Sequence, residues 1–256
     1  MVELNKIYCE DCLETMSKME DNSIDFIFTD PPYGHNNNNG DMASRWEAIF
    51  EGKKDNYIPE KDWRPIANDG KEANDLFKAC VNEWQRILKP GSCCCCCGGG
   101  GPDPQFARWS LWLDEAFNGG FKHMVIWDKG PMGMGHHYRR SYETILVAQK
   151  KGAACKWYAD GKDIENVIRP GAFGIKKIIP QANQHPTEKS YKLSKYFIYL
   201  HSKEGDVVYD PFIGSGSTIE AAIMMKRNWI GSEISQQYVD LANKRIEPFL
   251  MQTNLF

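Results

Sequence analysis

The stretch Asp206-Val207-Val208-Tyr209-Asp210-Pro211-Phe212-Ile213-Gly214-Ser215-Gly216-Ser217-Thr218 decides the fold of this chain. Its opening residues form an apolar run typical of a buried strand, and a glycine turn then leads into a helical pattern over 219–226. A glycine turn between a strand and a helix lets a ligand approach the backbone at the carboxyl edge of a parallel sheet. The stretch therefore indicates an α/β fold with a ligand site at this turn.

A second strand, 229–232, follows the helix and ends at Glu233, where a carboxylate can accept hydrogen bonds from ribose hydroxyls. A Gly-x-Gly turn alone does not require a ligand, because the same residues are typical of a tight connection between a strand and a helix. The sequence lacks the longer Gly-x-Gly-x-x-Gly pattern of dinucleotide sites and the Gly-Lys-Ser/Thr of phosphate-binding loops. The turn and Glu233 together favour a nucleoside cofactor without a phosphate chain.

The rest of the chain alternates strand and helix patterns, which predicts a doubly wound, mostly parallel sheet of the Rossmann-like type. Strands are expected at 23–29, 93–97, 122–127 and 143–148, and helices from Ala73 to Leu88, from Phe106 to Phe117, from a Thr187 cap to His201, and after a Ser235 cap. We interpret residues 1–256 as a single domain with two insertions. Residues 35–73 are expected to form an insertion or lid, and residues 150–184 a loop-bearing insertion.

Five consecutive cysteines, Cys93 to Cys97, occupy one of the predicted strands. Neighbouring strand residues point to opposite faces, so the run cannot converge on one tetrahedral metal, and adjacent cysteines rarely bridge each other. We interpret the run as small apolar side chains in a central strand. Adjacent histidines seldom share a metal, which argues against a site at His136 and His137, and no metal is predicted.

The formal net charge of −3 hides an uneven distribution. Residues 121–203 hold 15 Lys and Arg against 6 Asp and Glu, whereas residues 1–120 hold 12 against 21. A local basic face suits a nucleic-acid partner, although a solvated basic face is also common. No apolar stretch is long enough to span a bilayer and no signal peptide is recognisable, so a cytoplasmic protein is expected.

The tetrapeptide Asp30-Pro31-Pro32-Tyr33 follows the strand at 23–29. Two prolines remove two N–H donors, so the turn offers the Asp30 carboxylate and carbonyl oxygens as acceptors. An amino group bound there could donate both hydrogens and turn its lone pair toward an electrophile, while Tyr33 offers a face for a base. A structural Asp-Pro turn beside a core tyrosine explains the same residues equally well.

The two motifs in this order resemble the β group of DNA amino methyltransferases, in which the Asp-Pro-Pro-Tyr motif precedes the glycine loop. The resemblance covers most of the chain and extends to the segments 84–91, 127–130, 142–143, 185–189 and 231–233. Glutamine methyltransferases have a similar Pro-Pro-Tyr motif, but their glycine loop comes first. The resemblance implies a Rossmann-like fold and S-adenosyl-L-methionine as cofactor.

The resemblance also implies the roles of individual residues. Asp30, Pro31, Pro32 and Tyr33 would form the target-base site, and Glu233 would bind ribose. The other expected cofactor contacts are Asp11, Asp210, Phe212, Gly214, Gly216, Thr218, His185, Thr187 and Lys189, with Ser190 standing where the family often has proline. Candidates for phosphate contact in the basic segment are Arg139, Arg140, Lys150, Lys151, Lys176 and Lys177.

The expected function is site-specific transfer of a methyl group to N6 of a flipped adenine in DNA. Members of the group whose motif opens with Asp mostly modify adenine, and those that open with Ser mostly modify cytosine. N4-methylation of cytosine is the first alternative, and a non-catalytic nucleotide- or nucleic-acid-binding module is the second. Expected partners are DNA and a cognate restriction endonuclease, with no membrane, and both a monomer and a homodimer fit the sequence.

Overall fold

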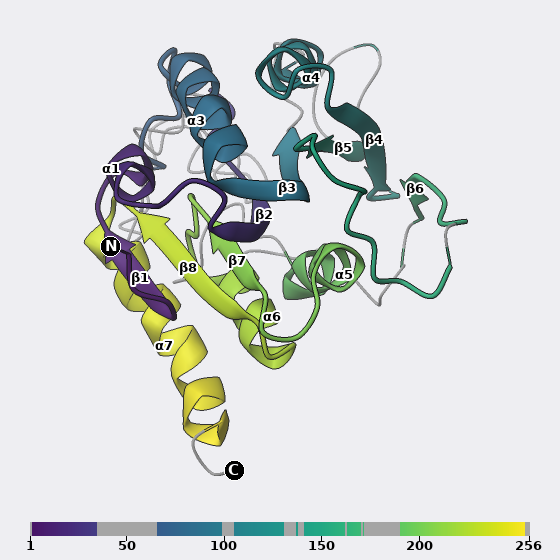
Figure 1. Cartoon of the computed structure of the whole chain (residues 1–256). Coiled ribbons are helices and arrows are strands. Elements are labelled where there is room, and N and C mark those ends of the chain that lie inside the picture. The colour runs from purple at the N-terminus through teal and green to yellow at the C-terminus, as the bar shows by residue number, and fades with distance from the viewer. Residues whose placement is uncertain are drawn as a thin grey trace.

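The computed structural model describes residues 2–34, 66–98, 105–130, 137, 141–161, 163–169, 171 and 190–253. These residues contain one eight-stranded sheet, with strand order β1-β8-β7-β2-β3-β5-β4-β6 (Figure 1). Its strands are β1 (Lys6–Cys9), β2 (Ile24–Thr29), β3 (Leu88–Gly98), β4 (Phe121–Asp128), β5 (Tyr142–Gln149), β6 (Val167–Ile168), β7 (Val207–Asp210) and β8 (Asn228–Glu233).

Strand β5 is antiparallel to β3 and β4, and every other neighbouring pair in the sheet is parallel. The predicted mostly parallel, doubly wound sheet is therefore confirmed. The carboxyl ends of β1, β8 and β7 come together, because Cys9 pairs with Glu233 and Asp210 pairs with Gly231. Strand β2 lies beside β7 in the same direction, which brings Asp30 to the same edge of the sheet.

Helices cover both faces of the sheet (Figure 1). One core cluster joins α1 (Cys12–Ser17), α3 (Ala73–Ile87) and α4 (Gln105–Ala116) to one face, and another joins α5 (Tyr191–His201), α6 (Ser217–Met224) and α7 (Gln236–Thr253) to the other. Of the helices that the structure describes, none combines the length and the apolar character needed to cross a membrane.

The five cysteines lie in β3 and are buried, as predicted. Cys93, Cys95 and Cys97 face the cluster of α5 to α7, while Cys94 and Cys96 face the cluster of α1, α3 and α4. This alternation follows from the pleat of a strand buried on both faces. Small side chains on both faces let two helical layers approach the centre of the sheet.

Strand β3 begins at Leu88, not at residue 93 as predicted, and β6 was not predicted. Two further differences concern the start of α5 and the N-terminus. Ser190, not Thr187, is the N-cap of α5 and directly precedes its first residue, Tyr191. The Ser190 Oγ accepts a hydrogen bond from the Lys192 N–H at 3.3 Å. The second difference is at the N-terminus, where β1 and α1 form although neither was predicted. Both elements are short, and β1 is exposed at its two ends, so neither produces a long apolar pattern.

Candidate active site

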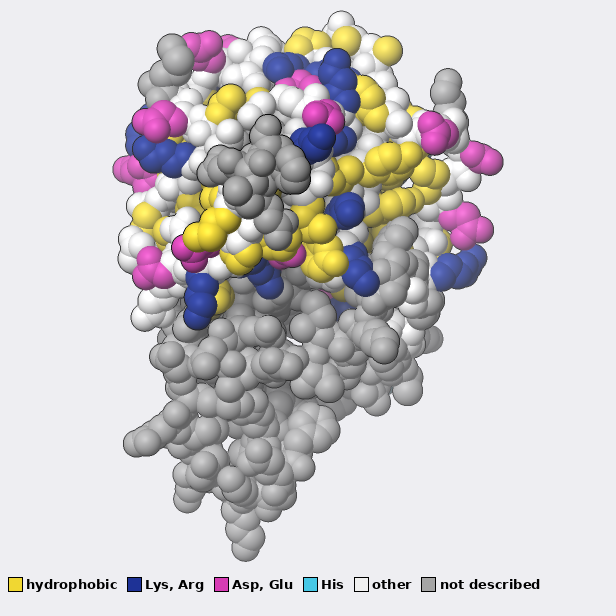
Figure 2. Space-filling model, turned by 90° about the horizontal axis from the view of Figure 1, so that it is seen from below, with side chains coloured by type: hydrophobic (Ala, Val, Ile, Leu, Met, Phe, Trp, Pro, Cys, Tyr) yellow, Lys and Arg dark blue, Asp and Glu magenta, His cyan; other side chains and the backbone are white. Residues whose placement is uncertain are grey.

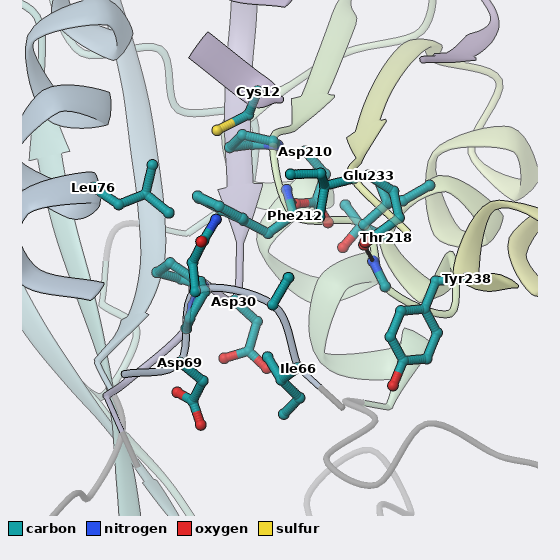
Figure 3. A pocket seen from close by; sticks show the side chains of 18 of the residues that line it. Cys12, Asp30, Ile66, Asp69, Leu76, Asp210, Phe212, Thr218, Glu233 and Tyr238 are labelled. Carbon is teal, nitrogen blue, oxygen red and sulfur yellow. Dashed lines mark hydrogen bonds between the residues drawn. The ribbon is translucent and has the colours of Figure 1, made fainter. Parts of the chain in front are cut away.

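A pocket opens at the carboxyl ends of β1, β2, β7 and β8 (Figure 3). It brings together the acidic turn after β1, the Asp-Pro-Pro-Tyr turn after β2, the glycine loop after β7 and the end of β8. Residues of these segments that line it include Asp11, Asp30, Pro31, Pro32, Tyr33, Asp210, Phe212, Gly214, Thr218 and Glu233. The two motifs, far apart in sequence, thus share one pocket.

Asp210 anchors the start of the glycine loop. Its Oδ1 accepts hydrogen bonds from the Thr29 hydroxyl at 2.7 Å and from the Phe212 N–H at 3.0 Å. Burial raises the pKa of Asp210 to about 6, and the bond from Thr29 opposes that rise. Asp210 therefore connects the loop to β2, the strand that ends directly before Asp30. With a pKa of about 6, the Asp210 carboxyl is mostly ionised at neutral pH.

Glu233 joins the glycine loop to the end of β8. Its Oε2 accepts from the Gly214 N–H at 3.1 Å and its Oε1 from the Ser235 N–H at 2.9 Å. Burial raises the pKa of this carboxyl, and the backbone hydrogen bonds counter the rise. Each carboxylate oxygen has a further lone pair, so Glu233 can still accept two hydroxyl groups. This acceptor set fits the ribose of a nucleoside cofactor.

Asp11 lies at the same edge of the sheet as Glu233, because β1 runs parallel to β8 and Cys9 pairs with Glu233. It is the N-cap of α1, and its Oδ1 accepts from the Leu13 N–H at 2.8 Å. Cap geometry holds the carboxylate at the pocket wall, where the structure places both Glu10 and Asp11. The predicted acid near the N-terminus is thus positioned to reach a cofactor bound at Glu233.

Gly216 does not line the pocket with its neighbours in the loop. It adopts φ 84° as the N-cap of α6, and a Cβ atom there would lie 2.9 Å from the Ala242 Cβ of α7. A side chain at Gly216 would therefore meet α7 first, and the expected cofactor contact of Gly216 stays a prediction. This glycine is required by its backbone conformation and by the close approach of α7.

The Asp30 carboxylate has a hydrogen bond with the Tyr33 side chain, whose hydroxyl donates to Oδ1. Burial raises the pKa of Tyr33 well above its ordinary value, and the neighbouring Asp30 adds to the rise, so the hydroxyl remains a donor. The Tyr33 ring lies 5.9 Å from the Trp109 ring, tilted by 44°. An amino group that binds to Asp30 would share the carboxylate with the Tyr33 hydroxyl or replace it, because each carboxylate oxygen can accept two hydrogen bonds.

Asp69 holds the backbone of the same turn. Its Oδ1 accepts from the Tyr33 N–H at 2.9 Å and from the Gly34 N–H at 2.8 Å, and the residue is buried. Asp69 and Ile66 also line the pocket, so the described end of the predicted insertion at 35–73 forms part of the site (Figure 3). No motif marks Asp69 in the sequence, and residues 35–65 lie outside the described ranges.

We expect Asp69→Ala to lower kcat by about 10- to 100-fold, because two hydrogen bonds to a charged acceptor, each contributing about 1.5–3 kcal/mol, are removed. Cofactor affinity should change by less than about two-fold, since Asp69 contacts the turn after β2. Asp69→Asn keeps an acceptor oxygen and should restore most of kcat, as measured by steady-state methylation and calorimetry. Equal losses in Asp69→Ala and Asp69→Asn would contradict a positioning role.

Comparison with known proteins places these features in a family. The sequence model of the N6/N4 methyltransferase family, described as DNA methylase, matches residues 24–244 of this chain. The chain belongs to this family. It is a DNA amino methyltransferase with S-adenosyl-L-methionine as cofactor.

Two type II methyltransferases are similar over most of the chain. M2.DpnII of Streptococcus pneumoniae is 28% identical, over 93% of this chain and 87% of its own length. M.HinfI of Haemophilus influenzae is 27% identical, over 95% of this chain and 68% of its own length.

Solved structures share the fold. A DNA modification methylase of Thermus thermophilus, complexed with S-adenosyl-L-methionine, matches with a TM-score of 0.64 and 20% identity over 95% of this chain and 93% of its own. The PvuII cytosine-N4-specific methyltransferase matches with a TM-score of 0.69 and 18% identity over 96% and 87%. These identities support the fold and leave the target base open.

Several predicted contacts of the methyltransferase lie outside the described residues, namely His185, Thr187, Lys189, Arg139, Arg140, Lys176 and Lys177. Lys150 is described, and its Nζ donates to Asn22 Oδ1 at 2.8 Å and to the Arg86 carbonyl at 3.0 Å. It follows the end of the antiparallel β5, at the edge of the sheet opposite the pocket, and so does Lys151. This placement argues against phosphate contacts from Lys150 and Lys151 beside the active site.

The pocket also contains residues that the motifs do not mark. Cys12, Leu76, Ile234 and Tyr238 line it, from α1, α3, the turn after β8 and α7 (Figure 3). Tyr238 is 3% exposed, so the main signal for it in the sequence is the helical spacing that indicates any core residue. Ile234 directly follows Glu233, and a search of residues adjacent to the motifs could have found it.

Proposed function

We propose that this methyltransferase transfers a methyl group to N6 of adenine in DNA. The observation that carries the proposal is that Asp30 and Glu233 line one pocket, with the base-site motif on one side and the ribose acceptor on the other. The Asp that opens the Asp-Pro-Pro-Tyr motif supports adenine, through the family resemblance. Adenine, as a purine, also gains more from stacking on an aromatic ring than cytosine does.

The proposed mechanism uses Asp30 and the Pro31 carbonyl as acceptors for the two hydrogens of the target amino group. Those bonds turn the nitrogen lone pair toward the cofactor side of the pocket, which Glu233 and the glycine loop define. S-adenosyl-L-methionine supplies an electrophilic methyl group on a sulfonium. Asp30 then holds the proton that the amino nitrogen loses, or passes it to solvent, and the Tyr33 hydroxyl can return to Oδ1.

We further propose that the target base is rotated out of the duplex into this pocket. Extrusion costs a few kcal/mol, and stacking on an aromatic side chain contributes roughly 1–3 kcal/mol. The Tyr33 ring is packed beside Trp109 and its hydroxyl is bonded to Asp30, so the aromatic ring and the acceptor proposed for the base are held next to each other before a base enters.

The DNA-binding surface is proposed to include Arg139, Arg140, Lys176 and Lys177, from the basic segment 121–203. Figure 2 shows one face of the molecule, and on it the described Lys and Arg side chains are interspersed with Asp and Glu. The described residues on that face therefore form no continuous basic surface. Lys176 and Lys177 belong to the insertion at 150–184, which we propose as a target-recognition insertion, and the insertion at 35–73 is proposed as a lid or DNA-binding insertion. A cognate restriction endonuclease is proposed as a functional partner.

The target base is tested by digesting enzyme-treated DNA to nucleosides and identifying the methylated product by mass spectrometry. We expect N6-methyladenine, in an amount that depends on added S-adenosyl-L-methionine. N4-methylcytosine as the product would reject adenine and leave the mechanism in place. The absence of any methylated nucleoside, with cofactor binding intact, would instead favour a non-catalytic binding module.

A further inference from the structure

Three side chains of types that can bind a metal meet away from the residues that line the pocket. Cys93 is the first of the five cysteines in β3, Cys155 lies in the segment after β5, and His201 ends α5. The sulfurs of Cys93 and Cys155 are 3.7 Å apart. One ligand atom from each of the three residues lies within 4.8 Å of the other two.

His201 contributes an independent observation. The residue is 4% exposed, and its Nδ1 is buried without a hydrogen-bond partner among the described residues. Its ring is stacked on Phe26 at 5.3 Å and meets Trp157 edge-on at 5.4 Å. A buried polar atom without a partner is costly, so this nitrogen calls for a ligand. The two aromatic rings fix the imidazole in a defined orientation beside the sulfurs.

The geometry points to a zinc ion bound by Cys93, Cys155 and His201. Zinc binds thiolate sulfur at about 2.3 Å and imidazole nitrogen at about 2.0 Å with tetrahedral angles, which separates two sulfur ligands by about 3.8 Å. The observed sulfur separation of 3.7 Å matches this value. Two thiolates and one imidazole are a donor set that zinc prefers.

Backbone hydrogen bonds hold the Cys155 segment in place on both sides of the site. The Lys156 N–H donates to the Gly91 carbonyl at 2.9 Å, and the Tyr158 N–H donates to the Leu200 carbonyl at 2.9 Å. Cys155 is therefore fixed between the start of β3 and the end of α5. Because Cys155 is exposed, a water molecule would be the fourth ligand, in contrast to structural zinc sites that are closed by four protein ligands.

The site has a structural role in this proposal. Cys93 lies in the middle of β3 and pairs with Gln149, the last residue of β5, whereas the pocket lies where the parallel strands end. A bound ion would join β3, the segment after β5 and α5, which belong to distant parts of the sequence. The sequence argument against a metal considered the cysteine run as a unit, and only its first member meets Cys155 and His201.

The test uses the full chain, purified under reducing conditions and treated with chelator, and titrates it with Co²⁺ as a spectroscopic probe. We expect a thiolate-to-cobalt charge-transfer band that saturates at one equivalent, and Zn²⁺ should abolish it. Zn²⁺ alone should raise the melting temperature. Cys155→Ser should weaken Co²⁺ binding at least about 100-fold. Cys9→Ser, which replaces another exposed cysteine, is the matched control and should titrate like the parent chain.

Two results would overturn the proposal. One is a Cys155→Ser variant that binds Co²⁺ as tightly as the Cys9→Ser control. The other is a Cys93–Cys155 disulfide, detected as a cross-linked peptide in protein isolated without reductant. This result overturns the proposal if the disulfide also forms when the protein is incubated with Zn²⁺. Methyl transfer by the chelator-treated protein at a temperature below its melting point should be unchanged within about two-fold, because the ion lies away from the pocket. Loss of methylation in chelator would contradict the structural role.

Discussion

Asp30→Ala is expected to lower kcat for methyl transfer by about 10²–10⁴-fold, the range in which a positioned acid–base group contributes to catalysis. The carboxylate lines the pocket and belongs to the motif assigned to the target base, whereas the glycine loop follows β7. The dissociation constant for S-adenosyl-L-methionine should therefore stay within about two-fold of the parent value. Steady-state methylation and calorimetry measure the two quantities separately.

The control for this substitution is Tyr33→Phe. Asp30→Ala also removes the acceptor for the Tyr33 hydroxyl, which is partly buried, and that loss can cost about 1 kcal/mol of stability. Tyr33→Phe breaks the same bond, keeps the ring and leaves the Asp30 carboxylate. We expect its kcat to remain within about ten-fold of the parent. A parallel loss of cofactor affinity and activity in Asp30→Ala would place Asp30 in the cofactor site instead.

The main features of the site could be predicted because they follow parallel strands. Residues that follow parallel strands of one sheet come together at its carboxyl edge, so Asp30, Asp210 and Glu233 converge once the strands pair. The same reasoning applies to Asp11, although the strand that carries it was not predicted. Position in the chain and the αβ alternation brought Asp30, Asp210 and Glu233 together, whereas Asp11 was named from the family resemblance.

Other parts of the site depend on tertiary contacts that leave no pattern in the sequence. Asp69 reaches the turn after β2 from the end of a long irregular segment, and neither its neighbours nor its spacing indicates that contact. Gly216 belongs to the motif, yet its missing side chain makes room for Ala242 of α7. A loop position can require glycine because a ligand approaches the backbone or because a neighbouring element does, and only the packing distinguishes these two reasons.

Glu233 is expected to contribute strongly to the affinity for the cofactor. Hydrogen bonds to a charged group contribute about 1.5–3 kcal/mol, and 1.4 kcal/mol corresponds to a factor of ten in affinity. Loss of two ribose contacts in Glu233→Ala should therefore raise the dissociation constant for S-adenosyl-L-methionine by at least about 100-fold. Calorimetry at neutral pH measures the change, with Glu233→Gln expected between the parent and the alanine variant.

Glu233→Ala would also remove the acceptor for the Gly214 and Ser235 N–H groups, which hold the glycine loop. Binding of a second ligand without ribose hydroxyls distinguishes the loss of ribose contacts from the loss of this support. An S-adenosylhomocysteine analogue without the ribose 2′ and 3′ hydroxyls should bind the parent protein much more weakly than S-adenosylhomocysteine does. In Glu233→Ala the two ligands should bind with similar affinity, since the acceptor for the hydroxyls is gone. If the hydroxyl groups increase affinity equally in both proteins, Glu233 acts only by holding the glycine loop, and the ribose is bound elsewhere.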